Sequence, residues 1–349
     1  MEQNLWRTSK KQIVCQKMNN DSVFHAFQVD EMPENQFIGK IIEKQISDLP
    51  QGETLIRVYY SSLNYKDALS ATGNRGVTKH YPHTPGIDAA GIVEYSENEN
   101  FTKGDKVVVT GNDLGMNTAG GFGQYIRVPA QWIVHLPENL TLKESMIYGT
   151  AGFTAAVMVE KLAHIINPNS GKIIVSGATG GVGSMAVAML AKTGYNVCAI
   201  SGKEQEQNFL QHIGAKEIIP RDEFLSMENK PLLKAMFAGG IDTVGGAILE
   251  NMIKTTNVFG CVTTCGSVAG TNLNLSVFPF ILRGVSLIGM SSQNYPNALR
   301  QGLWNKMANE FKPPFLSGLS TEISINQLND YIKLILEGKL KGRTVVNLQ

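Results

Sequence analysis

Hydrophobic positions in the first part of the chain fall into short runs. From about Phe24 to Gly149, clusters of Gly, Pro, Asn and Asp separate these runs at roughly ten-residue spacing. The pattern predicts strands and is typical of an antiparallel, barrel-like domain. The predicted strands are Thr54–Tyr59, Ala89–Tyr95, Lys106–Thr110, Gln124–Val128 and Trp132–His135.

The pattern changes after Gly149, where apolar runs begin to alternate with helical stretches. Such alternation indicates βαβ units and a parallel sheet. Six strands are expected, which is what a doubly wound dinucleotide-binding sheet needs. They are Ile173–Ser176, Asn196–Ile200, Glu217–Ile219, Ile241–Val244, Cys261–Cys265 and Val285–Met290. The tail Gly342–Leu348 is expected to form a last strand that returns to the first domain.

These patterns predict an α/β protein of two domains, and 349 residues are enough for two cores. Residues 22–150 would form the mainly-β domain, which residues 293–349 complete. Residues 151–292 would form a Rossmann domain. Residues 1–21 are expected to be a loosely ordered extension.

Composition narrows the function classes. Hydrophobic residues make up 43%, charged residues 17%, and the formal charge is +1, so nothing global favours nucleic acid or a membrane surface. No apolar run is long enough to span a bilayer, and the first twenty residues lack a secretory signal, so a cytoplasmic protein is expected. The four cysteines form no CxxC pair, and Cys261 and Cys265 are expected to be small core residues.

A glycine-rich segment follows the first strand of the parallel sheet. It contains Thr179, Gly180, Gly181, Val182 and Gly183, and a helix is expected after it. Missing side chains let backbone N–H groups approach a pyrophosphate, and the helix N-terminus adds favourable partial charge. A plain tight turn is the alternative. The strand before and the helix after favour a cofactor loop.

The end of the second parallel strand distinguishes NAD from NADP. A site for NAD usually places Asp or Glu there, whereas this chain has Ser201, Gly202 and Lys203. A hydroxyl and an ammonium would bind the 2′-phosphate of NADPH, and Arg221 after the third strand could add a guanidinium. Each charge alone could be a solvated surface residue, but their joint placement at strand ends predicts NADPH.

With these residues in hand, the chain resembles the medium-chain dehydrogenase/reductase superfamily over essentially all of Phe24–Gln349. Within it, the resemblance is to the acrylyl-CoA reductase branch, whose members are often labelled quinone oxidoreductases. The segments that carry the resemblance are Ser61–Ala68 (SSLNYKDA), Pro85–Asp88 (PGID), Gly149–Ala155 (GTAGFTA), the glycine-rich loop, Ser201–Lys203, Pro220–Phe224, Asp242–Gly245 and Pro279–Arg283.

The resemblance implies a GroES-like catalytic domain interrupted by the Rossmann domain. It implies NADPH-dependent reduction of a small 2-enoyl-CoA, acryloyl-CoA above all, with cofactor contacts from Tyr65, Val244 and Gly266. In related proteins the last Rossmann strand, here Val285–Met290, pairs with its two-fold mate. This strand is apolar and carries no charge, so an exposed edge would be an aggregation hazard, and a homodimer is expected.

The chain departs from zinc-containing members of the superfamily at the metal site. Asn64-Tyr65 and Ile87 stand where those enzymes carry cysteine and histidine ligands, and the cysteine-rich zinc lobe is absent. We therefore expect no metal. Without a Lewis acid to polarise a carbonyl, reduction of an activated C=C bond is favoured, because the substrate's own thioester takes up the negative charge.

Three polar residues are the candidates for catalysis. Tyr65 could protonate or stabilise the enolate, Asn64 could hold the substrate carbonyl or the nicotinamide amide, and Asp67 could orient its neighbours. From chemistry alone, all three could instead fix a turn after a strand. Water remains an alternative proton donor. Candidates for the phosphates of coenzyme A are Arg75, Lys79 and Arg283, each equally plausible as a surface charge.

Two other functions remain open. One is a quinone or enal reductase that uses the same cofactor geometry. The other is an NADPH-binding regulatory protein without turnover.

Overall fold

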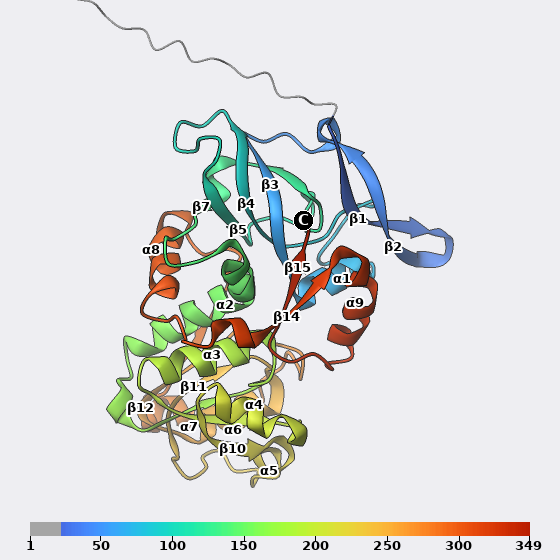
Figure 1. The fold of residues 1–349 in the computed structure, drawn as a ribbon. Coiled ribbons are helices and arrows are strands. Elements are labelled where there is room, and N and C mark those ends of the chain that lie inside the picture. Colours follow the sequence, from blue (N-terminus) through green and yellow to red (C-terminus); the bar gives the residue numbers. More distant parts are fainter. Residues whose placement is uncertain (1–21) are drawn as a thin grey trace, which may run out of the picture.

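The computed structural model describes residues 22–349, and Figure 1 shows two bodies with the long helix α2 (Leu142–Ala163) between them. Helix α2 packs against strands of both bodies. The extension expected over residues 1–21 lies outside the described residues, as does Cys15. Among residues 22–349, no helix has the length and apolar character needed to cross a membrane.

The upper body in Figure 1 contains a seven-stranded sheet with the order β14-β15-β3-β4-β5-β7, and β6 pairs with β3. Neighbouring strands are antiparallel except β14 and β15. The five strands predicted for this domain are present as β3 (Thr54–Leu63), β4 (Asp88–Ser96), β5 (Lys106–Thr110), β6 (Tyr125–Val128) and β7 (Ile133–His135).

Three strands of the upper body were not predicted one by one. β1 (Val23–Met32) and β2 (Gln36–Gln45) form a separate antiparallel pair, and β14 (Ser320–Ser324) lies at the edge of the larger sheet. The predicted tail strand is confirmed as β15 (Arg343–Asn347). It runs antiparallel to β3, with Thr344 opposite Leu63, so the end of the chain returns to the first body.

The lower body is a six-stranded parallel sheet with the order β10-β9-β8-β11-β12-β13, the doubly wound arrangement that was predicted. Its strands are β8 (Lys172–Val175), β9 (Asn196–Ser201), β10 (Ala215–Pro220), β11 (Phe237–Asp242), β12 (Thr256–Thr264) and β13 (Ser286–Gly289). The fold class, a mainly-β domain plus a Rossmann sheet, is confirmed.

Two details of the lower body differ from the expectation. β11 begins at Phe237, earlier than predicted, and includes Gly239 and Gly240, where a Cβ would lie 2.5 Å from the Cys261 oxygen and 2.7 Å from a methionine methyl. Close packing, rather than a loop, therefore explains these glycines. Cys261 is buried as expected, but Cys265 is exposed because β12 ends at Thr264.

Helix α2 breaks its helical geometry at Gly149, which has φ +50°. A side chain here would lie 2.4 Å from Ser62 Oγ and 2.5 Å from Asp88 Oδ2, so the close approach requires glycine. The break falls one residue before the predicted domain boundary at residues 150 and 151, and the boundary itself stays a prediction.

The remaining helices cover the sheets, and several of them contribute buried side chains to the hydrophobic clusters. They are α1 (Tyr65–Ala71), α3 (Gly181–Lys192), α4 (Gln207–His212), α5 (Arg221–Leu225), α6 (Gly246–Lys254), α7 (Phe278–Arg283), α8 (Asn297–Ala308) and α9 (Leu328–Leu336).

Candidate active site

The glycine-rich loop lies between β8 and α3, at the carboxyl edge of the parallel sheet. A Cβ on Gly183 would lie 2.2 Å from the Gly177 oxygen, so only glycine allows α3 to start this close to β8. Gly180 is the N-cap of α3, and no side chain caps the helix. The predicted residues from Thr179 through Gly183 thus lie together at an uncapped helix N-terminus, where an anion is favoured.

The turn after β9 gathers the charges predicted for the 2′-phosphate. Ser201 Oγ accepts a hydrogen bond from the Lys203 N–H at 3.0 Å. A Cβ on Gly202 would meet Arg221 Cζ at 2.9 Å, so the guanidinium lies directly against this turn. Lys203 Nζ donates to the carbonyl of Leu340 at 2.8 Å, and burial lowers the pKa of Lys203.

Val244 and Gly266 follow β11 and β12 at the same edge of the sheet. The carboxylate of Asp242 is fully buried and accepts hydrogen bonds from Thr264 Oγ1 at 2.7 Å and from the Val244 N–H at 3.2 Å. A Cβ on Gly266 would lie 1.9 Å from the carbonyl carbon of Thr243, so its backbone lies against this turn. The structure therefore places both residues on the edge that holds the glycine-rich loop.

A buried polar network links β3, β4 and β15 of the upper body to helix α2, at a place that we call the junction. Asp88 accepts from Ser62 Oγ at 2.6 Å, Asn64 Nδ2 at 2.7 Å and Thr150 Oγ1 at 2.6 Å. Arg343, from β15, donates to Asn64 Oδ1 at 3.1 Å and lies 3.9 Å from Asp88 Oδ2. Both charges are buried, so each depends on the other and on these hydrogen bonds.

Asp67 sits behind this network. Its carboxyl accepts hydrogen bonds from the backbone N–H groups of Asn64 and Ile87, both at 2.8 Å, and caps the start of α1. Complete burial and the nearby charge of Asp88 raise the pKa of Asp67 to about 7, although the backbone donors oppose the shift.

These contacts bear on two of the predicted catalytic residues. Both ends of the Asn64 amide are engaged, Nδ2 by Asp88 and Oδ1 by Arg343. Asp67 is fully buried, and its bonds to neighbouring backbone match the expected orienting of its neighbours. Both side chains position the start of α1, and their parts in catalysis remain predictions.

Tyr65 and Lys66, which lie between Asn64 and Asp67 in the sequence, differ from them in being less buried. The Tyr65 side chain is 44% exposed at the first position of α1, and its role remains a prediction. Lys66 is partly buried, and its ammonium donates to Gln293 Oε1 at 2.8 Å, on the segment that follows β13. Burial lowers the pKa of Lys66, with Asp67 acting in the opposite direction.

Arg283, one of the three predicted contacts to coenzyme A, is bound to backbone oxygens, and its contact to coenzyme A remains a prediction. The Arg283 guanidinium donates to the backbone oxygens of Leu233, Lys254 and Thr256. Thr256 is the first residue of β12, so Arg283 lies at the edge of the sheet opposite to the glycine-rich loop.

Arg75 and Lys79 lie together on the upper body. Arg75 pairs with Glu31 and donates to the Lys79 carbonyl at 2.9 Å, and its guanidinium lies 5.2 Å from the centre of the Tyr81 ring. Its charge is therefore already neutralised. Contacts from Arg75 and Lys79 to coenzyme A remain predictions.

The sequence reasoning missed the roles of Asp88, Arg343, Thr150 and Lys66. Asp88 and Arg343 did carry a signal, because each is a charged residue at the start of an otherwise apolar strand. A charge is rarely buried unless it is paired, so two such residues indicate a partner for each other. Nothing in the local sequence shows which residues meet.

No group of three or more His, Cys, Asp or Glu side chains among residues 22–349 could hold a metal ion. At the position where zinc-containing relatives carry a histidine, Ile87 is buried and apolar. Asn64, Tyr65 and Ile87, which stand at the zinc-ligand positions of those relatives, offer neither a thiolate nor an imidazole and so do not suit zinc.

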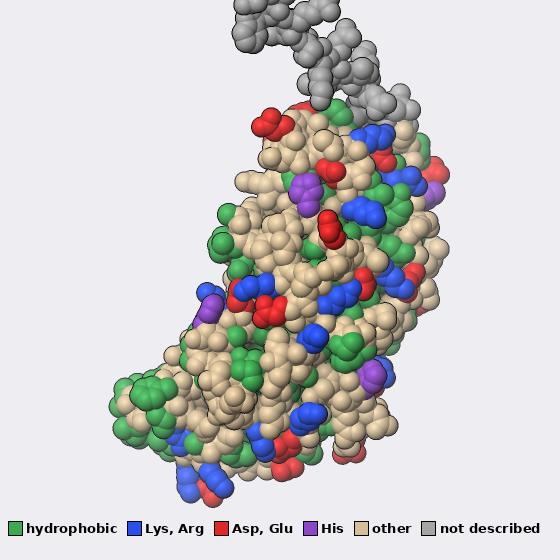
Figure 2. Space-filling view, turned by 60° about the vertical axis from the view of Figure 1, so that its left-hand side comes forward, with side chains coloured by type: hydrophobic (Ala, Val, Ile, Leu, Met, Phe, Trp, Pro, Cys, Tyr) green, Lys and Arg blue, Asp and Glu red, His purple; other side chains and the backbone are tan. Residues whose placement is uncertain are grey.

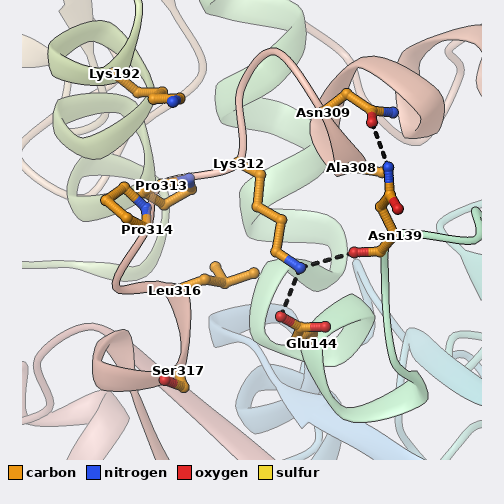
Figure 3. A pocket seen from close by; sticks show the side chains of 10 residues that line it. All are labelled: Asn139, Glu144, Lys192, Ala308, Asn309, Lys312, Pro313, Pro314, Leu316 and Ser317. Atoms are coloured by element: carbon orange, nitrogen blue, oxygen red, sulfur yellow. Dashed lines mark hydrogen bonds and ion pairs between the residues drawn. The ribbon is translucent and has the colours of Figure 1, made fainter.

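A cavity of about 490 Å³ lies elsewhere, near the C-terminal end of α3 and beside α2 (Figure 3). Within it, Lys312 donates to Glu144 at 2.7 Å and to the Asn139 carbonyl at 2.7 Å. None of the predicted site residues lines this cavity, and the charge of Lys312 is already paired. We assign it no part in the reaction.

Comparisons with known proteins agree with this architecture. Residues 50–138 match the alcohol dehydrogenase GroES-like domain, and residues 181–309 match the zinc-binding dehydrogenase family. The chain is 38% identical over 328 residues to the acrylyl-CoA reductase AcuI of Ruegeria pomeroyi, covering 93% of this chain and 99% of that protein. It is 41% identical over 303 residues to the "Probable acrylyl-CoA reductase AcuI" of Escherichia coli, covering 86% and 93%.

A quinone oxidoreductase of Sus scrofa is 30% identical over 195 residues, which cover 55% of this chain and 56% of that protein. Two crystal structures have nearly the same fold. The yhdH oxidoreductase of Salmonella enterica in complex with NADP is 40% identical with a TM-score of 0.90, covering 93% of this chain and all of that chain. The yhfP protein of Bacillus subtilis with NAD bound is 38% identical with a TM-score of 0.91, covering 94% and 100%.

The fold, the glycine-rich loop and these similarities lead to one assignment. The chain belongs to the medium-chain dehydrogenase/reductase superfamily and, within it, to the AcuI, YhdH and YhfP family of oxidoreductases.

Proposed function

We propose that the protein uses NADPH to reduce the C=C bond of a small 2-enoyl-CoA, with acryloyl-CoA as the expected substrate. The observation that carries this proposal is the junction itself. Ile87 stands where zinc-containing members carry a histidine, and the Asn64 amide is engaged by Asp88 and Arg343, so the site suits a substrate that takes up the negative charge on its own thioester. The AcuI relatives support the choice of acryloyl-CoA.

The residues at the carboxyl edge of the parallel sheet fit NADPH. There is no room for a side chain at Gly183, and no side chain caps the start of α3. The backbone N–H groups there can therefore approach a pyrophosphate closely. Lys203 and Arg221 offer two positive charges to a 2′-phosphate, and β9 ends in Ser201 rather than in a carboxylate. When bound, NADPH supplies a hydride.

The chain's own residues then handle charge and protons. Tyr65 is the exposed hydroxyl at the junction, and it can donate a hydrogen bond to the enolate or a proton to the α-carbon. Water is the alternative proton donor. Asn64 and Asp67 act through position, because they fix the first turn of α1, on which Tyr65 lies.

The proposal is tested by steady-state oxidation of NADPH against a panel of enoyl-CoAs, enals and quinones. We expect turnover with acryloyl-CoA and loss of activity when the coenzyme A moiety is removed. Equal rates with free enals or quinones would favour the alternative reductase, which the quinone oxidoreductase relative supports. Tight NADPH binding without turnover of any compound would favour a regulatory protein.

We also propose that the protein is a homodimer joined through β13. β13 is the edge strand of the six-stranded sheet, and next to it lies a set of exposed apolar side chains. Phe259 is 76% exposed and Ile281 is 68% exposed, and Figure 2 shows hydrophobic side chains gathered at the lower end of the molecule. Pairing with a second copy would cover the edge and this surface.

A cytoplasmic location is the last part of the proposal. Cys198, Cys261 and Cys265 are free thiols, and Cys265 is exposed. Thiols persist in this form in reducing compartments. Cell fractionation that places the protein with a secreted or periplasmic marker would contradict this location.

A further inference from the structure

Two lysines differ from the surface lysines of the described chain in what their ammonium groups contact. Surface lysines such as Lys172 pair with a carboxylate. Lys66 and Lys203 are partly buried, and each donates to a neutral oxygen far away in the sequence, Gln293 Oε1 for Lys66 and the Leu340 carbonyl for Lys203. Burial lowers the pKa of both. A desolvated ammonium with only a neutral partner is prepared to bind an anion.

The order of the parallel strands places these lysines at opposite ends of a bound dinucleotide. In a doubly wound sheet the adenosine half lies over the first three strands and the nicotinamide half over the last three. Lys203 follows β9, in the adenosine half, where the 2′-phosphate is expected. Gln293, the partner of Lys66, follows β13, in the nicotinamide half, where the substrate reacts.

Contacts on two sides hold the Lys66 ammonium in place. On one side, Asp67 caps the first turn of α1. On the other, Arg300, which is 1% exposed, donates to the Gln293 carbonyl at 3.1 Å and to the Thr110 carbonyl at 3.0 Å. The segment that carries Gln293 is thereby fixed to the upper body. A donor fixed before the reaction stabilises developing charge most effectively.

We propose that Lys66 is a catalytic residue whose ammonium binds the thioester oxygen of the substrate and stabilises the negative charge that this oxygen gains. The inference rests on the proposed function. When the β-carbon accepts the hydride, the C=C electron pair moves toward the thioester and its oxygen becomes an enolate oxygen. The α-carbon then takes a proton from Tyr65 or water, and the C=O bond re-forms. Lys66 keeps its proton throughout.

Turnover of acryloyl-CoA by the Lys66→Met variant is the first test. Loss of a preorganised donor to an oxyanion lowers kcat by about 10²- to 10³-fold, and we expect this loss with a much smaller change in KM. Lys66→Arg keeps the charge and should recover part of the rate. Lys44→Met is the matched control, because Lys44 is also partly buried on β2 and should leave kcat unchanged.

Gln293→Ala separates catalysis from a structural tether. This variant removes the same bridge but keeps the positive charge. If Lys66 acts only through this bridge, Gln293→Ala and Lys66→Met will lower kcat equally, and the inference is overturned. We expect Gln293→Ala to lower kcat much less than Lys66→Met, because only the fixed position of the ammonium is lost.

A binding measurement gives a readout that needs no turnover. Calorimetry in the presence of NADP⁺ compares propionyl-CoA with S-propyl-CoA, a thioether that lacks the carbonyl oxygen. Lys66→Met should weaken the thioester by only about two- to tenfold, because its ground-state oxygen is neutral, and should leave the thioether unchanged. Equal weakening of both would refute the contact. If wild-type protein neither turns over acryloyl-CoA nor binds propionyl-CoA, the proposed function itself fails.

Discussion

If Lys203 binds the 2′-phosphate as proposed, at the place where NADH carries a hydroxyl, its charge should decide between the two cofactors. Lys203→Glu replaces an attractive charge with a repulsive one. We expect NADPH affinity to fall by about ten- to a hundredfold while NADH affinity changes little, as measured by fluorescence titration. Lys230→Glu, on an exposed lysine paired with Glu228, is the control. Equal losses for both cofactors would place the phosphate elsewhere.

The raised pKa of Asp67 predicts that the stability of the folded protein depends on pH. In the unfolded chain its carboxyl loses its proton near pH 4, whereas burial and Asp88 raise its pKa in the folded protein to about 7. Between these two pKa values the folded protein binds more protons than the unfolded chain. The contribution of Asp67 to the free energy of unfolding is therefore fully present below pH ~4 and is lost as the pH rises through about 7. Asp67→Asn removes this dependence.

Urea unfolding of wild type and Asp67→Asn at about pH 5 and about pH 8 measures the effect. The free energy of unfolding of wild type minus that of the variant should decrease by roughly 1 kcal/mol or more over this interval. A difference that does not change with pH would mean that Asp67 titrates normally.

Gly183, between β8 and α3, is packed so closely that one added methyl group should have a measurable effect. In Gly183→Ala the new Cβ would overlap the Gly177 oxygen, and backbone cannot move aside easily. We expect a loss of stability of about 1–3 kcal/mol together with loss of NADPH binding. Gly302→Ala on α8 meets no atom within 4 Å and should be neutral or stabilising by about 0.5–1 kcal/mol. Normal NADPH binding by Gly183→Ala would show that the loop does not hold the cofactor.

Features that depend on one continuous segment of the chain could be predicted from the sequence. The six parallel strands, the glycine-rich loop and the turn at Ser201–Lys203 each lie in one continuous segment, and the structure has all of them. β11 was predicted too short because Gly239 and Gly240 look like a loop, whereas tight packing against neighbouring strands requires them.

The junction could not be predicted because its contacts join residues far apart in the chain. Asn64 meets a carboxylate 24 residues away and a guanidinium 279 residues away. Burial then decides which side chains can react. It commits Asn64 and Asp67 to structure and leaves Tyr65 exposed, a distinction that the motif of neighbouring residues does not contain.

On the scale of the whole molecule, the C-terminal tail connects the two bodies at the cofactor edge. Just before β15, the Leu340 carbonyl accepts from Lys203, Lys341 pairs with Glu206 at 2.9 Å, and the Gly342 N–H donates to the Thr179 carbonyl at 2.9 Å. The upper body thus contacts both the glycine-rich loop and the turn after β9.

The proposed dimer predicts which surface mutation separates the subunits. Ile281→Glu places a charge in the exposed apolar set beside β13 and should give monomers, because a buried unpaired charge disfavours the interface. Leu299→Glu changes a comparably exposed side chain on α8 and should leave the dimer intact. Light scattering at micromolar concentration measures both variants. A wild-type mass near 38 kDa, that of one chain, would contradict the dimer.

In the proposed reaction a hydride reaches the β-carbon of an enoyl thioester without help from a metal ion. To test this, chelator-treated protein is incubated with acryloyl-CoA and NADPH deuterated at the transferred position, and the deuterium is located by NMR. We expect propionyl-CoA with one deuterium on the β-carbon and a rate unaffected by chelation. Deuterium on the carbonyl carbon, or activity that disappears with the chelator and returns with zinc, would contradict it.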